Sequence, residues 1–169
     1  MNIMFYIAGA VAVAATVVTV TRLNVVHALL YLVISLLAVA VVFYTLGAPF
    51  VAALEVIIYA GAIMVLFVFV VMLLNLGKAE ARTESGLLKP SMWIGPGVLA
   101  AILIAELIYL VTAGTGGAYP AGMVAAQQVG MALFGPYLLG VELASMLLLA
   151  GLVAAYHLGW RKPSRTEVR

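Results

Sequence analysis

The chain has 169 residues, of which 67% are hydrophobic and 8% are charged, and its mean hydropathy is +1.27. Soluble domains carry about 25% charged residues, so this composition predicts an integral membrane protein and excludes a lone soluble enzyme. The formal net charge is only +2, and the chain has two histidines and no cysteine. These counts leave no disulfide or thiolate metal site and argue against a dedicated metal centre. We expect contact with the lipid bilayer and none with nucleic acid.

Five stretches contain the roughly 20 apolar residues that a helix needs to cross about 30 Å of hydrocarbon. They predict an all-α membrane fold with one transmembrane domain at residues 1–160 and a basic cytoplasmic tail at residues 161–169. No Lys or Arg precedes the first stretch, so it is predicted to be a retained helix and not a signal peptide. The Gly- and Ala-rich loop before the last helix is a candidate for a short surface helix. The predicted helices cover residues 3–20, 26–46, 50–76, 92–112 and 136–158.

All basic residues fall on one side of the predicted membrane. They occupy the first inter-helix turn, the loop between the third and fourth helices, and the tail: Arg22; Lys78, Arg82 and Lys89; Arg161, Lys162, Arg165 and Arg169. Cytoplasmic loops carry an excess of Lys and Arg. The pattern therefore predicts an N-terminus outside and a cytoplasmic C-terminus.

Three glutamates lie inside predicted spans: Glu55, Glu106 and Glu142. An ionisable side chain costs about 2.5 to 3.5 kcal/mol at mid-bilayer, so each needs a reason. All three are predicted in the outer third of the membrane. They could form a carboxylate cluster that handles protons or binds a cation. Alternatively, each side chain snorkels outward or meets a basic partner on a neighbouring protein.

The third predicted span contains the segment LEVIIYAGAIMVLF at residues 54–67. Tyr59 follows Glu55 by four residues, which places both on one face of a regular helix. A phenol at this depth needs a partner for its hydroxyl. Gly61 costs a helix close to 1 kcal/mol relative to Ala, so it indicates a packing contact or a deformed turn. The span of 27 residues exceeds the hydrocarbon thickness, which a strong tilt or a π-bulge would absorb.

The longer segment LEVIIYAGAIMVLFVFVVMLLNL resembles the third transmembrane helix of the J-type membrane subunit of respiratory complex I, the proton-pumping NADH:quinone oxidoreductase. The mitochondrial counterpart is subunit six. Three further blocks support the resemblance in the same order and over most of the chain: NVVHALLYLVISLLAVAVVFYTLGAPF, LKPSMWIGP and ALFGPYLLGVELASMLLLAGLVAA.

The resemblance implies a core membrane-arm subunit that has no active site and helps couple quinone reduction to proton translocation. FMN, iron–sulfur clusters, NADH and quinone are expected in other subunits, and no cofactor is expected in this chain. The expected partners are the K-, A-, H- and N-type membrane subunits, and the expected location is the bacterial inner membrane. Two alternatives stay open: a small cation/proton antiporter component and a purely structural spacer.

The resemblance also implies a π-bulge in the third helix, within residues 59–66, whose switching opens or closes a water path. The helix would then act as a conformational gate. Glu106 falls outside any motif of the family. We therefore still expect its side chain to snorkel outward or to meet a basic partner on a neighbouring protein. Position 55 accepts Gln or Glu in the family. The candidate gate or proton-path residues are Tyr59, Gly61, Glu55, Glu142, Ala62, Met64 and Val65.

Overall fold

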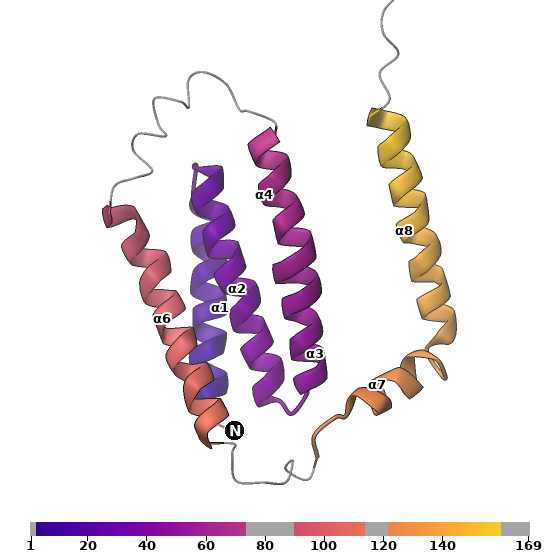
Figure 1. Cartoon of the computed structure of the whole chain (residues 1–169), viewed down its shortest axis with the longest axis horizontal. Helices are drawn as coiled ribbons and strands as arrows, with labels where there is room; N and C mark the ends of the chain where they lie inside the picture. Colours follow the sequence, from indigo (N-terminus) through magenta and orange to yellow (C-terminus); the bar gives the residue numbers. More distant parts are fainter. Residues whose placement is uncertain (1–2, 74–89, 114–121, 160–169) are drawn as a thin grey trace, which may run out of the picture. The chain divides into compact units, whose positions relative to one another are not determined.

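The computed structural model describes residues 3–73, 90–113 and 122–159, and within these ranges it is helical with no strand (Figure 1). The first two helices are α1 (Ile3–Thr21) and α2 (Val25–Thr45). The next three segments, α3 (Pro49–Leu54), η1 (Glu55–Ile63) and α4 (Met64–Leu73), follow one another without a break, and we call them together helix three. The remaining helices are α6 (Pro90–Ala113), α7 (Ala126–Leu133) and α8 (Leu138–Gly159).

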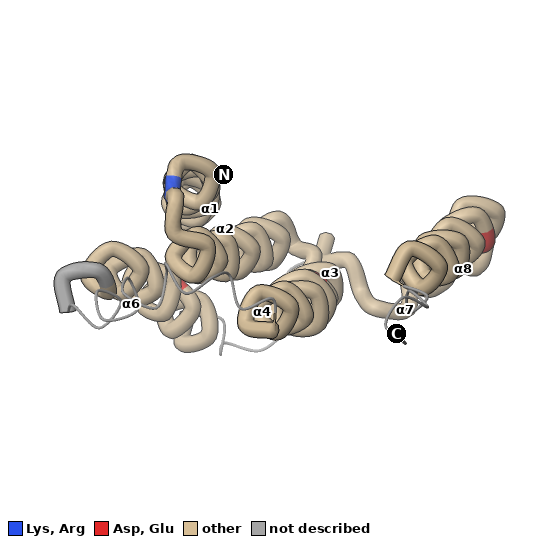
Figure 2. The backbone as a smooth tube through the Cα atoms, turned by 90° about the horizontal axis from the view of Figure 1, so that it is seen from above, with Lys and Arg blue, Asp and Glu red and all other residues tan. Residues whose placement is uncertain are grey.

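Five of these helices are long and apolar enough to cross a membrane, which confirms the predicted fold class. The end of the predicted third span at residues 74–76, the tail at 161–169 and every basic residue except Arg22 lie outside the described residues. Charged positions are correspondingly sparse along the described helices (Figure 2). The orientation of the termini therefore stays a prediction.

The described chain forms two compact units, Met1–Ala125 and Ala126–Arg169, and each is described by itself. In the first unit, α2 is the central helix: it contacts α1, α6 and all three segments of helix three, and α1 also contacts α6 (Figure 1). The short connection after α2 turns at Gly47, whose φ of +82° lies in the left-handed region that favours glycine. Pro49 then occupies the first turn of α3, where a missing N–H costs nothing.

Small residues make up most of the buried face of α1. Ala8 and Ala15 are fully buried, and Ala12 is 9% exposed. Helices in lipid associate through close packing, because lipid tails are as apolar as leucine, and alanines let the backbones approach. The buried core of this unit consists of Val11, Ala12, Ala15, Ile34, Ala38 and Leu103.

One polar contact crosses the same interface. The Ser35 hydroxyl of α2 lies 3.1 Å from the Ala12 carbonyl of α1, to which it donates, and 2.7 Å from the Thr16 hydroxyl. Thr16 also bonds the Ala12 carbonyl, at 2.8 Å. The two hydroxyls and the Ala12 carbonyl thus form one hydrogen-bonded cluster between α1 and α2.

Replacing Ser35 by Ala is expected to weaken the α1–α2 contact by about 0.6 kcal/mol, the average for polar contacts between membrane helices. The loss stays small because Thr16 keeps its bond to Ala12. Unfolding of the purified chain in mixed detergent would measure it. Thr21→Ala is the control, since the Thr21 hydroxyl bonds only its own helix, and an equal loss in both variants would contradict the interhelical assignment.

The second unit contains α7 and α8. The short helix α7 lies within the loop for which the sequence suggested one, and its position at the membrane surface stays a prediction. Neither helix has a buried residue within this unit. Most of the apolar surface of α8 is therefore left uncovered within this unit.

Candidate functional site

The hydrogen bonding of helix three changes at η1. At its start the Glu55 N–H bonds the carbonyl of Val51, four residues back, as in an α-helix. At its end the Met64 N–H bonds the carbonyl of Tyr59, five residues back, which is the π-helical pattern. The π segment spans Glu55–Ile63. It begins four residues earlier and ends three earlier than the range of 59–66 implied by the resemblance.

Gly61 has a specific reason to be glycine in this segment. A Cβ atom built on it would lie 3.1 Å from the carbonyl oxygen of Val56, five residues back. Such a contact is tighter than most real Cβ contacts, and a helical carbonyl cannot move away alone. The missing side chain thus leaves room for the wide turn. Of the two roles that the sequence allowed for Gly61, a packing contact or a deformed turn, the structure favours the deformed turn.

The remaining candidates in helix three differ in burial. Met64 is 2% exposed and anchors the segment in the first unit. Ala62 and Val65 are exposed, and Glu55 is half-buried. Tyr59 is 51% exposed and its hydroxyl has no hydrogen-bond partner among the described residues. The first unit therefore does not enclose the phenol, and the sequence expectation of a hydroxyl partner is not met among the described residues.

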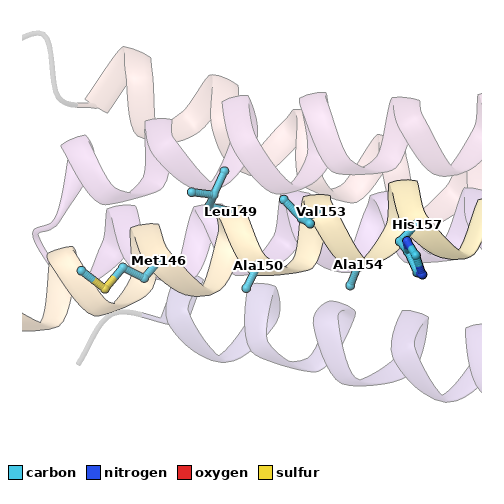
Figure 3. A pocket seen from close by; sticks show the side chains of 6 residues that line it. All are labelled: Met146, Leu149, Ala150, Val153, Ala154 and His157. Carbon is cyan, nitrogen blue, oxygen red and sulfur yellow. The ribbon is translucent and has the colours of Figure 1, made fainter.

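Glu142 lies on α8 in the second unit, where it is exposed. Glu55 belongs to the other unit, so a carboxylate cluster of the two stays a prediction. One face of α8 also carries a shallow apolar groove (Figure 3), lined by Met146, Leu149, Ala150, Val153, Ala154 and His157. All six residues belong to α8 alone.

The structure places Glu106 inside the first unit, contrary to the sequence expectation of an outward-pointing side chain. It is 5% exposed, on the face of α6 that packs in the first unit, and so it neither snorkels outward nor reaches another protein. The sequence does hold a signal for this placement. Leu99, Leu103 and Glu106 recur at intervals of four and three, and both leucines belong to the packed core.

A second close approach joins α2 and α6. The Tyr31 hydroxyl occupies the space where a side chain at Gly95 would begin. Tyr31 is 5% exposed; its ring packs edge-on against His27, with centroids 6.3 Å apart, and the Arg22 guanidinium lies 5.8 Å from its centroid. A cation over an aromatic face is stabilised by the negative face of the ring.

In the part of the chain that the structure describes, no group of three His, Cys, Asp or Glu side chains could hold a metal ion. The whole sequence has no cysteine, and biological iron–sulfur clusters are held mainly by cysteine thiolates. The chain therefore does not fit such a cluster.

Five apolar spans, one with a π-helical segment that includes a tyrosine and a glycine, define a polytopic membrane protein whose third spanning helix is deformed. Residues 15–158 match the family model described as NADH-ubiquinone/plastoquinone oxidoreductase chain 6. The chain belongs to this family, which confirms the resemblance seen in the sequence. It is thus a membrane subunit of an NADH-quinone oxidoreductase complex, an assembly of the complex I type.

Individual relatives agree. The chain is 55% identical to NADH-quinone oxidoreductase subunit J of Escherichia coli (strain K12), over 94% of this chain and 86% of the relative. It is 58% identical to the subunit J of Pseudomonas aeruginosa, over 94% and 96%. The subunit J of Buchnera aphidicola subsp. Schizaphis graminum is 46% identical, over 96% and 99%.

Proposed function

We propose that this subunit helps couple quinone reduction to proton translocation, with helix three acting as a conformational gate. The observation that supports the proposal is the π segment Glu55–Ile63 within a membrane-spanning helix. Segments of π-helix are rare and occur frequently at functional sites. A purely structural spacer would not require such a segment, since a regular α-helix would span the membrane equally well.

The hydrogen bonds of η1 suggest how the gate works. The Met64 N–H bonds the carbonyl of Tyr59, five residues back, whereas its α-helical partner would be the carbonyl of Ala60, one residue nearer. If the N–H groups of η1 bond carbonyls four residues back instead of five, the segment becomes α-helical. The residues before η1 then rotate about the helix axis relative to the residues after it. Because Met64 is buried and Tyr59 is exposed, the Tyr59 phenol moves while the anchored end stays in place.

The remaining assignments complete this picture. The five spans form a single transmembrane domain at residues 1–160, with the N-terminus outside and the C-terminus cytoplasmic in a bacterial inner membrane. The chain carries no active site; NADH, FMN, iron–sulfur clusters and quinone belong to other subunits. Its neighbours are the K-, A-, H- and N-type membrane subunits. Glu55, Ala62, Val65 and Glu142 are further gate or proton-path residues.

Tyr59→Phe tests the gate with the smallest change. The Tyr59 hydroxyl has no partner among the described residues of this chain, so on the proposal it bonds water or a neighbouring subunit. Loss of one such bond, about 1 kcal/mol, is expected to slow turnover about fivefold. The measurement is NADH-driven quinone reduction and proton pumping in membrane vesicles, with the amount of assembled complex determined on native gels.

Tyr109→Phe is the matched control, because Tyr109 is similarly exposed but lies on α6. It is expected to retain wild-type turnover. Unchanged pumping by a fully assembled Tyr59→Phe complex would favour the spacer.

A further inference from the structure

Glu106 is a buried acid that the proposed gate does not use. It lies on α6, with 5% of its surface exposed. Both carboxyl oxygens are inaccessible and have no hydrogen-bond partner among the described residues. Buried polar side chains are normally satisfied, so this one requires an explanation.

The surroundings of Glu106 are apolar. Leu103, one turn earlier on α6, belongs to the buried core with residues of α1 and α2. On the α1 side, the carboxyl lies near the backbone of Ala8, but no backbone group there reaches hydrogen-bonding geometry with it. The Ala8 side chain is itself fully buried. Alanine at this position offers no polar atom from its side chain. The carboxyl is thus enclosed by helices of its own chain.

No cation of the packed helices neutralises the carboxyl. The spans of α1 and α2 contain no lysine, arginine or acid, and their titratable groups are Tyr6, His27, Tyr31 and Tyr44. His27 and Tyr31 lie with Arg22 at the end of the bundle where α1 passes into α2. Ala8 is 13 residues before Thr21, the last residue of α1, so Arg22 is about 20 Å away along the helix.

An unpaired carboxylate in this setting costs several kcal/mol, whereas a neutral carboxylic acid costs far less. We propose that Glu106 is a proton-binding site, filled in this packing, between α1, α2 and α6. Release of the proton to water leaves a carboxylate that must be hydrated. Hydration requires α6 to separate from α1, so proton release and this helix contact are linked. The residues that enclose it belong to α1, α2 and α6, and none of those in the core cluster belongs to helix three.

Infrared difference spectroscopy of the assembled complex tests the site. The spectrum of wild type minus Glu106→Gln is expected to show the carbonyl band of one protonated carboxylic acid. Gln has the shape of the neutral acid, so the variant is expected to assemble at wild-type levels. Glu142→Gln is the control: Glu142 is exposed within its unit, and this variant is expected to keep the band that Glu106→Gln loses.

Two results would overturn the proposal. One is a difference spectrum that shows the bands of an ionised carboxylate in place of the acid band. The other is an acid band that remains unchanged in Glu106→Gln, because the band would then belong to a different carboxyl group. As a measurement on the unaltered complex, transfer into heavy water is expected to shift the band slowly. A shift as fast as that of exposed acids would contradict the enclosed site.

Discussion

Gly61→Val is expected to reduce the turnover of the assembled complex at least about tenfold. The added Cβ would lie 3.1 Å from the Val56 carbonyl oxygen, and the two γ-methyl groups add further bulk. Overpacking of this kind typically costs about 1 to 3 kcal/mol, and about 1.4 kcal/mol corresponds to tenfold in rate. The strain between the new side chain and the Val56 carbonyl is relieved when the N–H of residue 61 bonds the carbonyl four residues back instead of five. The substitution therefore favours the α pattern in helix three and blocks its return to the π pattern.

The measurement combines quinone reduction and proton pumping, normalised to the assembled complex. Gly9→Val is the matched control, because a Cβ at Gly9 meets no heavy atom within 4 Å. It makes the same change of residue in α1, with the same change in helix propensity, and is expected to leave turnover near wild type. Wild-type pumping by an assembled Gly61→Val complex would refute the gate, and equal losses in both variants would show a general packing defect.

The sequence predicted the spans well because the hydrocarbon thickness imposes a length on every crossing helix. The predicted first helix at residues 3–20 is α1 at Ile3–Thr21, and the predicted last helix at residues 136–158 is α8 at Leu138–Gly159. The π segment was harder to place. The excess length of the third span shows that residues must be absorbed, but length alone does not determine which amide bonds five residues back.

Lateral packing explains what the sequence reading of Glu106 missed. Depth in the membrane follows from position along a span, so the sequence placed the three glutamates of the predicted spans in one layer. Which face of α6 meets α1 depends instead on how the helices are arranged around α2. A residue on the packed face is enclosed by neighbouring helices, whereas a residue at equal depth on the opposite face is not. A carboxyl group therefore has different polar partners available on the two faces.

Gly95→Ala is expected to destabilise the contact between α2 and α6 by about 1 to 3 kcal/mol, the range for overpacking. Alanine at this position would overlap the hydroxyl of Tyr31, which is buried and fixed by His27 and Arg22. The change acts against helix propensity, since alanine in a helix interior is favoured over glycine by close to 1 kcal/mol. Thermal unfolding of the purified chain in detergent, together with the yield of assembled complex, measures the effect.

Two further variants separate this contact from a general effect of the substitution. Gly97→Ala lies two residues further along α6, and its Cβ would meet no atom within 4 Å, so it is expected to be neutral or slightly stabilising. Tyr31→Phe removes the overlapping hydroxyl and leaves ring carbon Cζ 3.3 Å from the new Cβ. The double variant with Gly95→Ala should therefore recover most of the lost stability, and such a coupling is expected only between residues in contact. Additive losses in the double variant would show that Gly95 serves α6 through its backbone and not through the space it leaves for Tyr31.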